Sequence, residues 1–146
     1  MKDTHDTPCG CGKRGCLEQY SSATGIVNET KKFLATSDAP SELRDLPTIT
    51  AKDIFDLAKE GDAVAMDQVQ EMPRLLGKAR AAVSCVCAPQ VIVLGGGVSR
   101  AGSVITDNVE KWFKEYAFPA SECTEFALAE LGNDAGIYGG VQMILG

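Results

Sequence analysis

The chain has 146 residues and a mass of 15.5 kDa, which is enough for about one domain. Hydrophobic residues make up 45% and charged residues 23%, a balance that excludes disordered and fibrous classes. A formal net charge of -6 without a basic run argues against nucleic acid as a partner, and no apolar stretch approaches the ~20 residues of a membrane span. Residues 1–8 are polar and lack a signal-peptide core, so a cytoplasmic location is expected.

The predicted elements begin with a polar loop, rich in glycine and cysteine, that ends at Cys16. The apolar spacing then predicts a helix over 17–35 that is bent or broken around Gly25. A loop follows, and the pattern at Thr50 is typical of a cap that starts a second helix. Gly61 is predicted to end that helix, and the residue after it can begin the next.

The second half of the chain alternates helical and strand patterns. A helix is predicted over 63–87, with a kink or break near Met72 because Pro73 lacks a backbone donor. The later predictions are a strand over 90–94, a helix over 103–116, a strand over 124–131 and a closely packed small-residue helix over 134–145. This order predicts an α/β fold with helices packed on a small sheet. Two strands are few for an independent sheet, so the chain is expected to be part of a larger unit.

Four conspicuous side chains are expected to have structural roles only. Cys85 and Cys87 stand at a helix end before a strand and are predicted to be buried thiols rather than a second metal site. Trp112 and Phe113 lie on an amphipathic helix and are predicted to belong to the core.

The other cysteines do not have the spacing of a secreted disulfide framework. Cys9, Cys11 and Cys16 are crowded into one glycine-rich loop, in which three thiolates could converge on zinc. A structural zinc takes four ligands, and His5 is a candidate for the fourth. The alternative is a flexible terminal histidine beside incidental thiols.

Three motifs of the chain resemble those of the ROK family, which groups bacterial sugar kinases with sugar-responsive repressors. The first motif is CGCGKRGCLE at 9–18, and the SSATG run at 21–25 that follows it resembles the glucokinase branch in particular. The other two are PQVIVLGGGVS at 89–99 and LGNDAG at 131–136, which stand in the same order as in the family. The resemblance covers nearly the whole chain.

The resemblance implies the C-terminal portion of an actin/hexokinase-like (ribonuclease H-like) kinase fold, in which two α/β lobes close over ATP and a hexose. It divides the chain into a zinc-binding cysteine loop over 1–18 and a C-terminal α/β lobe over 19–146, with the N-terminal lobe absent. The family's catalytic aspartate and zinc-binding histidine lie upstream of the cysteine motif. No catalytic residue is therefore expected in this chain, and His5 is out of the family's register.

The resemblance also assigns roles to individual residues of the cysteine motif. Cys9, Cys11 and Cys16 match the thiolates of a structural zinc ion. Glu18 matches a glutamate that hydrogen-bonds sugar hydroxyls, an interaction in which one carboxylate can accept from two neighbouring groups. The alternative for Glu18 is a solvated acid in the first turn of a helix, where the helix dipole favours it.

A second site is implied by the glycine run after the first strand. Gly95, Gly96 and Gly97 match the family's nucleotide-side turn, where missing side chains let the backbone approach adenosine and its phosphates. A glycine triplet after a strand is a weak signal when it stands alone.

The expected function is that of the C-terminal part of an ATP-dependent glucokinase, with ATP and Mg²⁺ bound in the complete enzyme and the isolated chain inactive. The enzyme would transfer the γ-phosphoryl group of ATP to the 6-hydroxyl of glucose. The alternatives are the effector lobe of a ROK-type repressor, a kinase for another hexose such as N-acetylmannosamine, fructose or mannose, and a stand-alone zinc-binding module. The resemblance also implies a homodimer.

Overall fold

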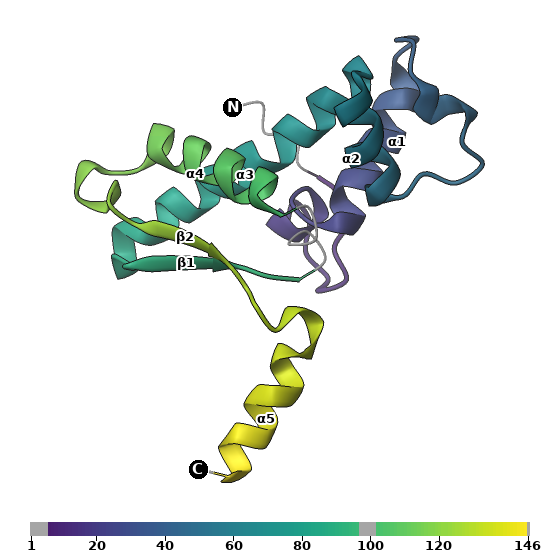
Figure 1. Ribbon diagram of the computed structural model, residues 1–146. Helices are drawn as coiled ribbons and strands as arrows, with labels where there is room; N and C mark the ends of the chain where they lie inside the picture. The colour runs from purple at the N-terminus through teal and green to yellow at the C-terminus, as the bar shows by residue number, and fades with distance from the viewer. Residues whose placement is uncertain (1–5, 97–101, 146) are drawn as a thin grey trace.

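The computed structural model describes residues 6–96 and 102–145, in which helices pack on one face of a two-stranded sheet (Figure 1). Its helices and strands are α1 (Ala23–Thr36), α2 (Ala51–Glu60), α3 (Ala63–Cys87), β1 (Val91–Leu94), α4 (Ser103–Tyr116), β2 (Glu125–Leu128) and α5 (Ala135–Leu145). The predicted alternation of helices and strands is therefore confirmed. No helix in these two ranges is both long and apolar enough to cross a bilayer.

The contact between α3 and α4 is the centre of the core. The two helices approach so closely that a Cβ atom on Gly77 would lie 2.8 Å from backbone atoms of Val109 and Phe113. Val109 and Phe113 are fully buried, and the Phe113 ring meets the ring of Phe126 edge-on at 5.1 Å. Helix α4 thus connects the long helix α3 to the sheet.

The two strands are parallel, and α4 belongs to the crossover that a parallel pair requires. Val91 pairs with Glu125, and Leu94 pairs with Leu128. Leu94 is buried under the helices, whereas Val91 and Val93 are 47% and 60% exposed. Among the described residues, therefore, only one face of the sheet is covered.

The helix boundaries around α2 follow local capping chemistry. The Thr50 side chain accepts from the amide of Asp53, and the Asp53 carboxylate accepts from the Thr50 amide at 2.9 Å. Gly61 ends the helix in the left-handed region with a φ of 98°. Asp62 then caps α3 by accepting from the amide of Ala65 at 2.9 Å. These predicted boundaries are confirmed.

The position predicted for the interruption of the first helix, around Gly25, is wrong. A 3₁₀ turn, Leu17–Gln19, comes first, and α1 starts only at Ala23. The interruption lies at Ser22, whose extended backbone and side chain cap α1 by accepting from the amide of Gly25 at 2.9 Å. Gly25 therefore lies inside the helix and does not break it.

Of the kink or break predicted near Met72, the break is wrong, because α3 is continuous from Ala63 to Cys87. Pro73 lies buried inside the helix. A proline removes one backbone hydrogen bond from a helix interior. The packing of α3 against α1, α2 and α4 compensates for that loss.

Two predictions of burial are wrong. Cys85 and Cys87 are exposed because they lie on the side of the last turn of α3 that no described residue covers. Val86 between them is 90% exposed, whereas Ser84 in the same turn is buried. Trp112 is only half-buried, whereas Phe113 belongs to the core as predicted. The apolar spacing over 103–116 therefore predicts the helix correctly, but the buried face of that helix is narrower than predicted.

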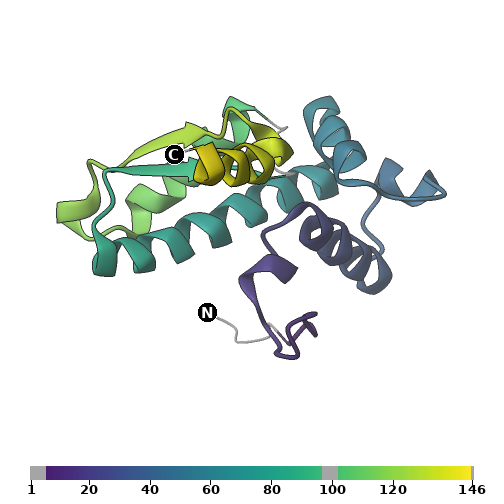
Figure 2. The same ribbon diagram turned by 90° about the horizontal axis from the view of Figure 1, so that it is seen from below.

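In Figure 1 the last helix, α5, projects below the sheet and away from the other helices, and in Figure 2, which is seen from below, it lies in front of the strands. Its large apolar side chains are 50–88% exposed. The close packing predicted for its glycines is absent among the described residues, since nothing lies within 4 Å of a Cβ atom built on Gly136, Gly139 or Gly140. The second strand is also shorter than predicted and spans only Glu125–Leu128.

Candidate functional site

The cysteine loop is a tight turn held by its own backbone. The Cys9 amide donates to the carbonyl of Lys13 at 2.9 Å, and the Gly12 amide donates to the carbonyl of Cys9 at 3.0 Å. Gly12 and Gly15 have φ angles of 84° and 70°, a left-handed conformation that glycine adopts without strain. The glycines of the motif are therefore what allows the loop to turn back on itself.

This turn brings the three predicted thiols together. The sulfur atoms of Cys9, Cys11 and Cys16 all lie within 4.8 Å of one another, and those of Cys11 and Cys16 are 3.5 Å apart. A tetrahedral zinc with its usual Zn–S bond length holds its sulfurs about 3.8 Å apart. The spacing and the soft thiolate donors therefore fit zinc. The fourth candidate, His5, lies outside the described residues.

The thiols of the cluster differ in acidity. The pKa of Cys9 is lowered, first by a hydrogen bond from the backbone of Cys11 and then by the thiols of Cys11 and Cys16. The pKa of Cys16 is raised to about 11, because it shares hydrogen bonds first with Cys11 and then with Cys9. The Cys9 thiol is thus more acidic than the Cys16 thiol, and zinc has to displace a proton from Cys16 in order to bind there.

Glu18, the residue that the motif assigns to the sugar, lies beside this cluster. It stands on the 3₁₀ turn Leu17–Gln19 directly after Cys16, and its carboxylate accepts from the Cys9 thiol at 3.9 Å. Glu18 is exposed, so its carboxylate is accessible from solvent.

A residue that sequence analysis missed, Gln19, joins the same cluster. Its side-chain amide donates to the Cys9 sulfur at 3.6 Å, and its backbone amide donates to the Cys16 carbonyl at 2.9 Å. Outer groups of this kind orient the ligands of metal sites. The only sequence signal was its place next to Glu18.

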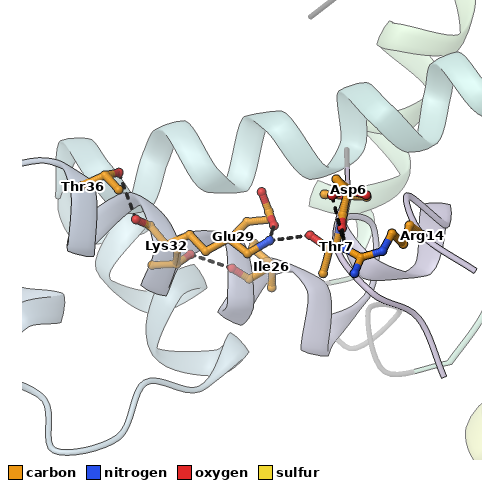
Figure 3. Close-up of polar contacts among 9 residues, drawn as sticks. Asp6, Thr7, Arg14, Ile26, Glu29, Lys32 and Thr36 are labelled. Carbon is orange, nitrogen blue, oxygen red and sulfur yellow. Dashed lines mark hydrogen bonds and ion pairs between the residues drawn. The ribbon is translucent and has the colours of Figure 1, made fainter. Parts of the chain in front are cut away.

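Polar contacts anchor the loop to α1 (Figure 3). The hydroxyl of Tyr20, a residue only 5% exposed, accepts from the Thr7 amide at 3.0 Å. Lys32 of α1 donates to the Thr7 hydroxyl, and its ammonium lies 5.9 Å from the centre of the Tyr20 ring. On the loop itself, Arg14 donates to the backbone and side chain of Asp6. The start of the loop is thereby fixed to the helix that follows it.

The glycine run occupies a different part of the fold, at the carboxyl end of β1. The Ala129 amide donates to the Leu94 carbonyl at 2.8 Å, and a Cβ atom on Gly95 would lie 3.2 Å from that of Ala129. Gly96 has a φ of 79°, so the chain turns there in a conformation suited to glycine. Gly97 lies outside the described residues. Ligands of open α/β sheets bind beyond the carboxyl ends of the strands, which is where this turn stands.

Comparison with known proteins assigns the family. Residues 1–146 match the ROK family. A glucokinase from Halalkalibacterium halodurans is 39% identical over 137 residues, which cover 91% of this chain and 42% of that protein. The chain therefore spans less than half the length of this relative.

Solved structures agree with this assignment. A ROK family glucokinase from Streptomyces griseus, in complex with glucose and AMPPNP, has a TM-score of 0.80 and 31% identity, over 95% of this chain and 47% of that one. A ROK family transcriptional regulator, a homologue of the E. coli MLC protein, has a TM-score of 0.71 and 29% identity, over 87% of this chain and 32% of that one. The predicted fold is confirmed as part of the actin/hexokinase-like fold of these sugar kinases. The chain belongs to the ROK family.

Proposed function

We propose that this chain forms the C-terminal part of an ATP-dependent glucokinase of the cytoplasm. The observation that carries the proposal is the exposed Glu18 carboxylate held beside three convergent thiols. Its support from comparison is the glucokinase that is 39% identical over 137 residues and the similar glucokinase crystallised with glucose and AMPPNP.

Glu18 is suited to orienting a hexose. An ionised carboxylate accepts hydrogen bonds from two neighbouring hydroxyls, which fixes the rotation of the sugar ring as well as its position. The backbone that carries Glu18 is already ordered, because the amides of Tyr20 and Ser21 donate to the Leu17 carbonyl at 3.0 Å and 2.8 Å. A preorganised carboxylate loses little conformational entropy when the sugar binds.

The thiols of Cys9, Cys11 and Cys16 would hold zinc in a structural role. When bound, the ion supplies a cross-link between the two ends of the loop, without redox chemistry. The cross-linked loop would then fix the position of Glu18, since the loop leads directly into the turn that carries this residue.

The turn after β1 is proposed to face the nucleotide. Gly95 and Gly96 present backbone without side chains, so adenosine and phosphate groups could approach closely. Phosphoryl transfer depends mainly on positioning and on neutralising charge, which ATP-bound Mg²⁺ would contribute. The base that removes the proton from the 6-hydroxyl of glucose is proposed to lie outside this chain, so the 146-residue chain alone would be inactive.

The test uses the protein expressed from the longest reading frame that encodes this chain. ADP release is measured with glucose, N-acetylmannosamine, fructose and mannose. Glucose is expected to give the highest kcat/KM, and Glu18→Gln is expected to raise the KM for glucose about tenfold or more. The control is Glu60→Gln, which changes an exposed acid at the end of α2.

Two results would contradict the proposal. One is the absence of phosphorylation of every sugar, and the other is an unchanged KM in Glu18→Gln. A protein that binds sugar by calorimetry without ADP release would favour the second candidate, a sugar-responsive repressor, which the similar transcriptional regulator supports.

A further inference from the structure

The turn that carries Glu18 packs directly on the first turn of α1. A Cβ atom placed on Gly25 would lie 2.8 Å from the carbonyl carbon of Gln19 and 2.9 Å from the carbonyl oxygens of Glu18 and Gln19. Real Cβ atoms essentially never lie within 3.0 Å of such atoms. The atoms in contact belong to the backbone, so they cannot rotate away as a flexible side chain would. Only glycine permits this approach.

The backbone conformation of Gly25 does not itself require glycine. Its φ is not among the positive angles of the chain, and it lies inside the regular helix α1. Glycine weakens a helix interior relative to alanine, because it has more conformational freedom to lose. Gly25 is also buried, with its amide bonded to the side chain of Ser22. This glycine therefore contributes space, which the backbone of Glu18 and Gln19 occupies.

The contact with Gly25 holds the backbone of Glu18 and Gln19, the two residues that flank the thiol cluster. Glu18 carries the carboxylate, and Gln19 donates to the sulfur of Cys9. The same turn is held on another side by Ser21, whose hydroxyl donates to the carbonyl of Met72 in α3 at 3.4 Å. A methyl group on Gly25 has to push this turn away from α1, which moves the carboxylate with it.

We propose that Gly25 is a positioning residue for sugar binding: its missing side chain lets α1 support the backbone of Glu18 at the correct distance. The inference rests on the proposed role of Glu18 in binding a hexose. Gly25 is buried, so its proposed effect on the sugar passes through the backbone of Glu18. A displacement of about 1 Å in a binding group can cost up to about a hundredfold in activity, so small shifts here are measurable.

The fold provides a matched control for steric crowding in Gly77. A Cβ atom there would lie 2.8 Å from the Phe113 amide nitrogen, the Trp112 Cβ and the Val109 carbonyl oxygen. Gly77→Ala therefore imposes a clash of the same severity at the α3–α4 contact, which the cysteine loop does not take part in. A loss of stability alone would affect both variants alike.

The experiment measures glucose KM, ATP KM, kcat and thermal unfolding in the protein from the longest reading frame that encodes this chain. Gly25→Ala is expected to raise the glucose KM about tenfold or more while the ATP KM stays within about twofold. Gly77→Ala is expected to lower the melting temperature and leave the glucose KM within about twofold. A folded Gly25→Ala protein with the wild-type glucose KM would overturn the inference. An equal rise of that KM in Gly77→Ala would overturn it too.

A second, milder pair of variants decides the matter if Gly25→Ala does not fold. Ser22→Ala removes the cap of α1 beside the contact, and Thr50→Ala removes the corresponding cap of α2. Ser22→Ala is expected to raise the glucose KM several-fold, and Thr50→Ala to leave it unchanged. An equal glucose KM in Ser22→Ala and Thr50→Ala would overturn the inference.

The failure of the proposed function is distinguishable from the failure of this inference. If Glu18→Gln leaves the glucose KM unchanged, the role of Glu18 is wrong and the inference falls with it. If Glu18→Gln raises the glucose KM and Gly25→Ala does not, only the role of Gly25 is wrong.

Discussion

The thiol of Cys9 donates to the carboxylate of Glu18 across 3.9 Å, which links the thiol cluster to the residue proposed to bind the sugar. Once Cys9 is ionised, it has no proton to donate, so the Glu18 carboxylate keeps its acceptor sites for other donors. Two neighbouring negative charges also repel each other, and a cation among the thiols offsets that repulsion. Ionisation of the thiols and metal binding by the cysteine loop therefore affect how well the Glu18 carboxylate can accept hydrogen bonds.

The first prediction concerns the reactivity of thiols in the 146-residue chain. With equimolar zinc, three of the six cysteines are expected to react rapidly with a thiol reagent, and all six after chelation. Bound thiolates are protected by the metal, whereas the cysteines outside the loop are exposed. Those expected to react rapidly are Cys85, Cys87 and Cys123. The control variant Cys123→Ser is expected to have two rapidly reacting thiols when zinc is present. Rapid reaction of all six cysteines of the unchanged protein with zinc present would contradict the proposed zinc site.

Zinc binding to the chain is expected to tighten as the pH rises from about 6 to about 8. Each thiol must lose its proton to become a ligand, and the pKa of Cys16 is about 11 in the metal-free loop. Protons therefore compete with zinc more strongly at the lower pH, although the lowered pKa of Cys9 reduces the competition at that sulfur. Competition with a chromogenic chelator measures the affinity. An affinity independent of pH in this range would show that the thiols are not the ligands.

The anchor between the loop and α1 gives a third prediction. Tyr20→Phe removes the acceptor of the Thr7 amide, and the loss of such a bond costs about 1 kcal/mol. Zinc affinity is expected to fall several-fold while the helical content is retained, because the start of the loop is no longer held. The comparison variant is Tyr138→Phe, on the exposed helix α5. Equal zinc affinities of the two variants would show that this anchor has no influence on the metal site.

Local chemistry allowed much of the chain to be predicted from the sequence. Thr50, Gly61 and Asp62 define helix ends through bonds to residues close in sequence. The convergence of Cys9 and Cys16 was predictable for the same reason, since a short glycine-containing loop connects them. In each case the partner lies within a few residues.

The features that were mispredicted depend on distant contacts. The sequence pattern predicts a bend or break at Gly25, but the role of this glycine is set by the backbone of Gln19, which lies against it. Whether Cys85 and Cys87 are buried depends on which side of the last turn of α3 other elements cover, and the periodicity of the sequence does not show that. Pro73 is predicted from the sequence to kink or break its helix, but tertiary packing keeps that helix continuous.

The central claim is that a metal-bound cysteine loop holds Glu18 in place for a hexose. Calorimetry of glucose binding tests it most directly, on the protein from the longest reading frame that encodes this chain, with zinc, after chelation and after zinc is restored. Chelation is expected to weaken glucose binding about tenfold or more, equivalent to about 1.4 kcal/mol, and restored zinc to recover it. Identical glucose affinities with the three thiols occupied and empty would contradict the claim.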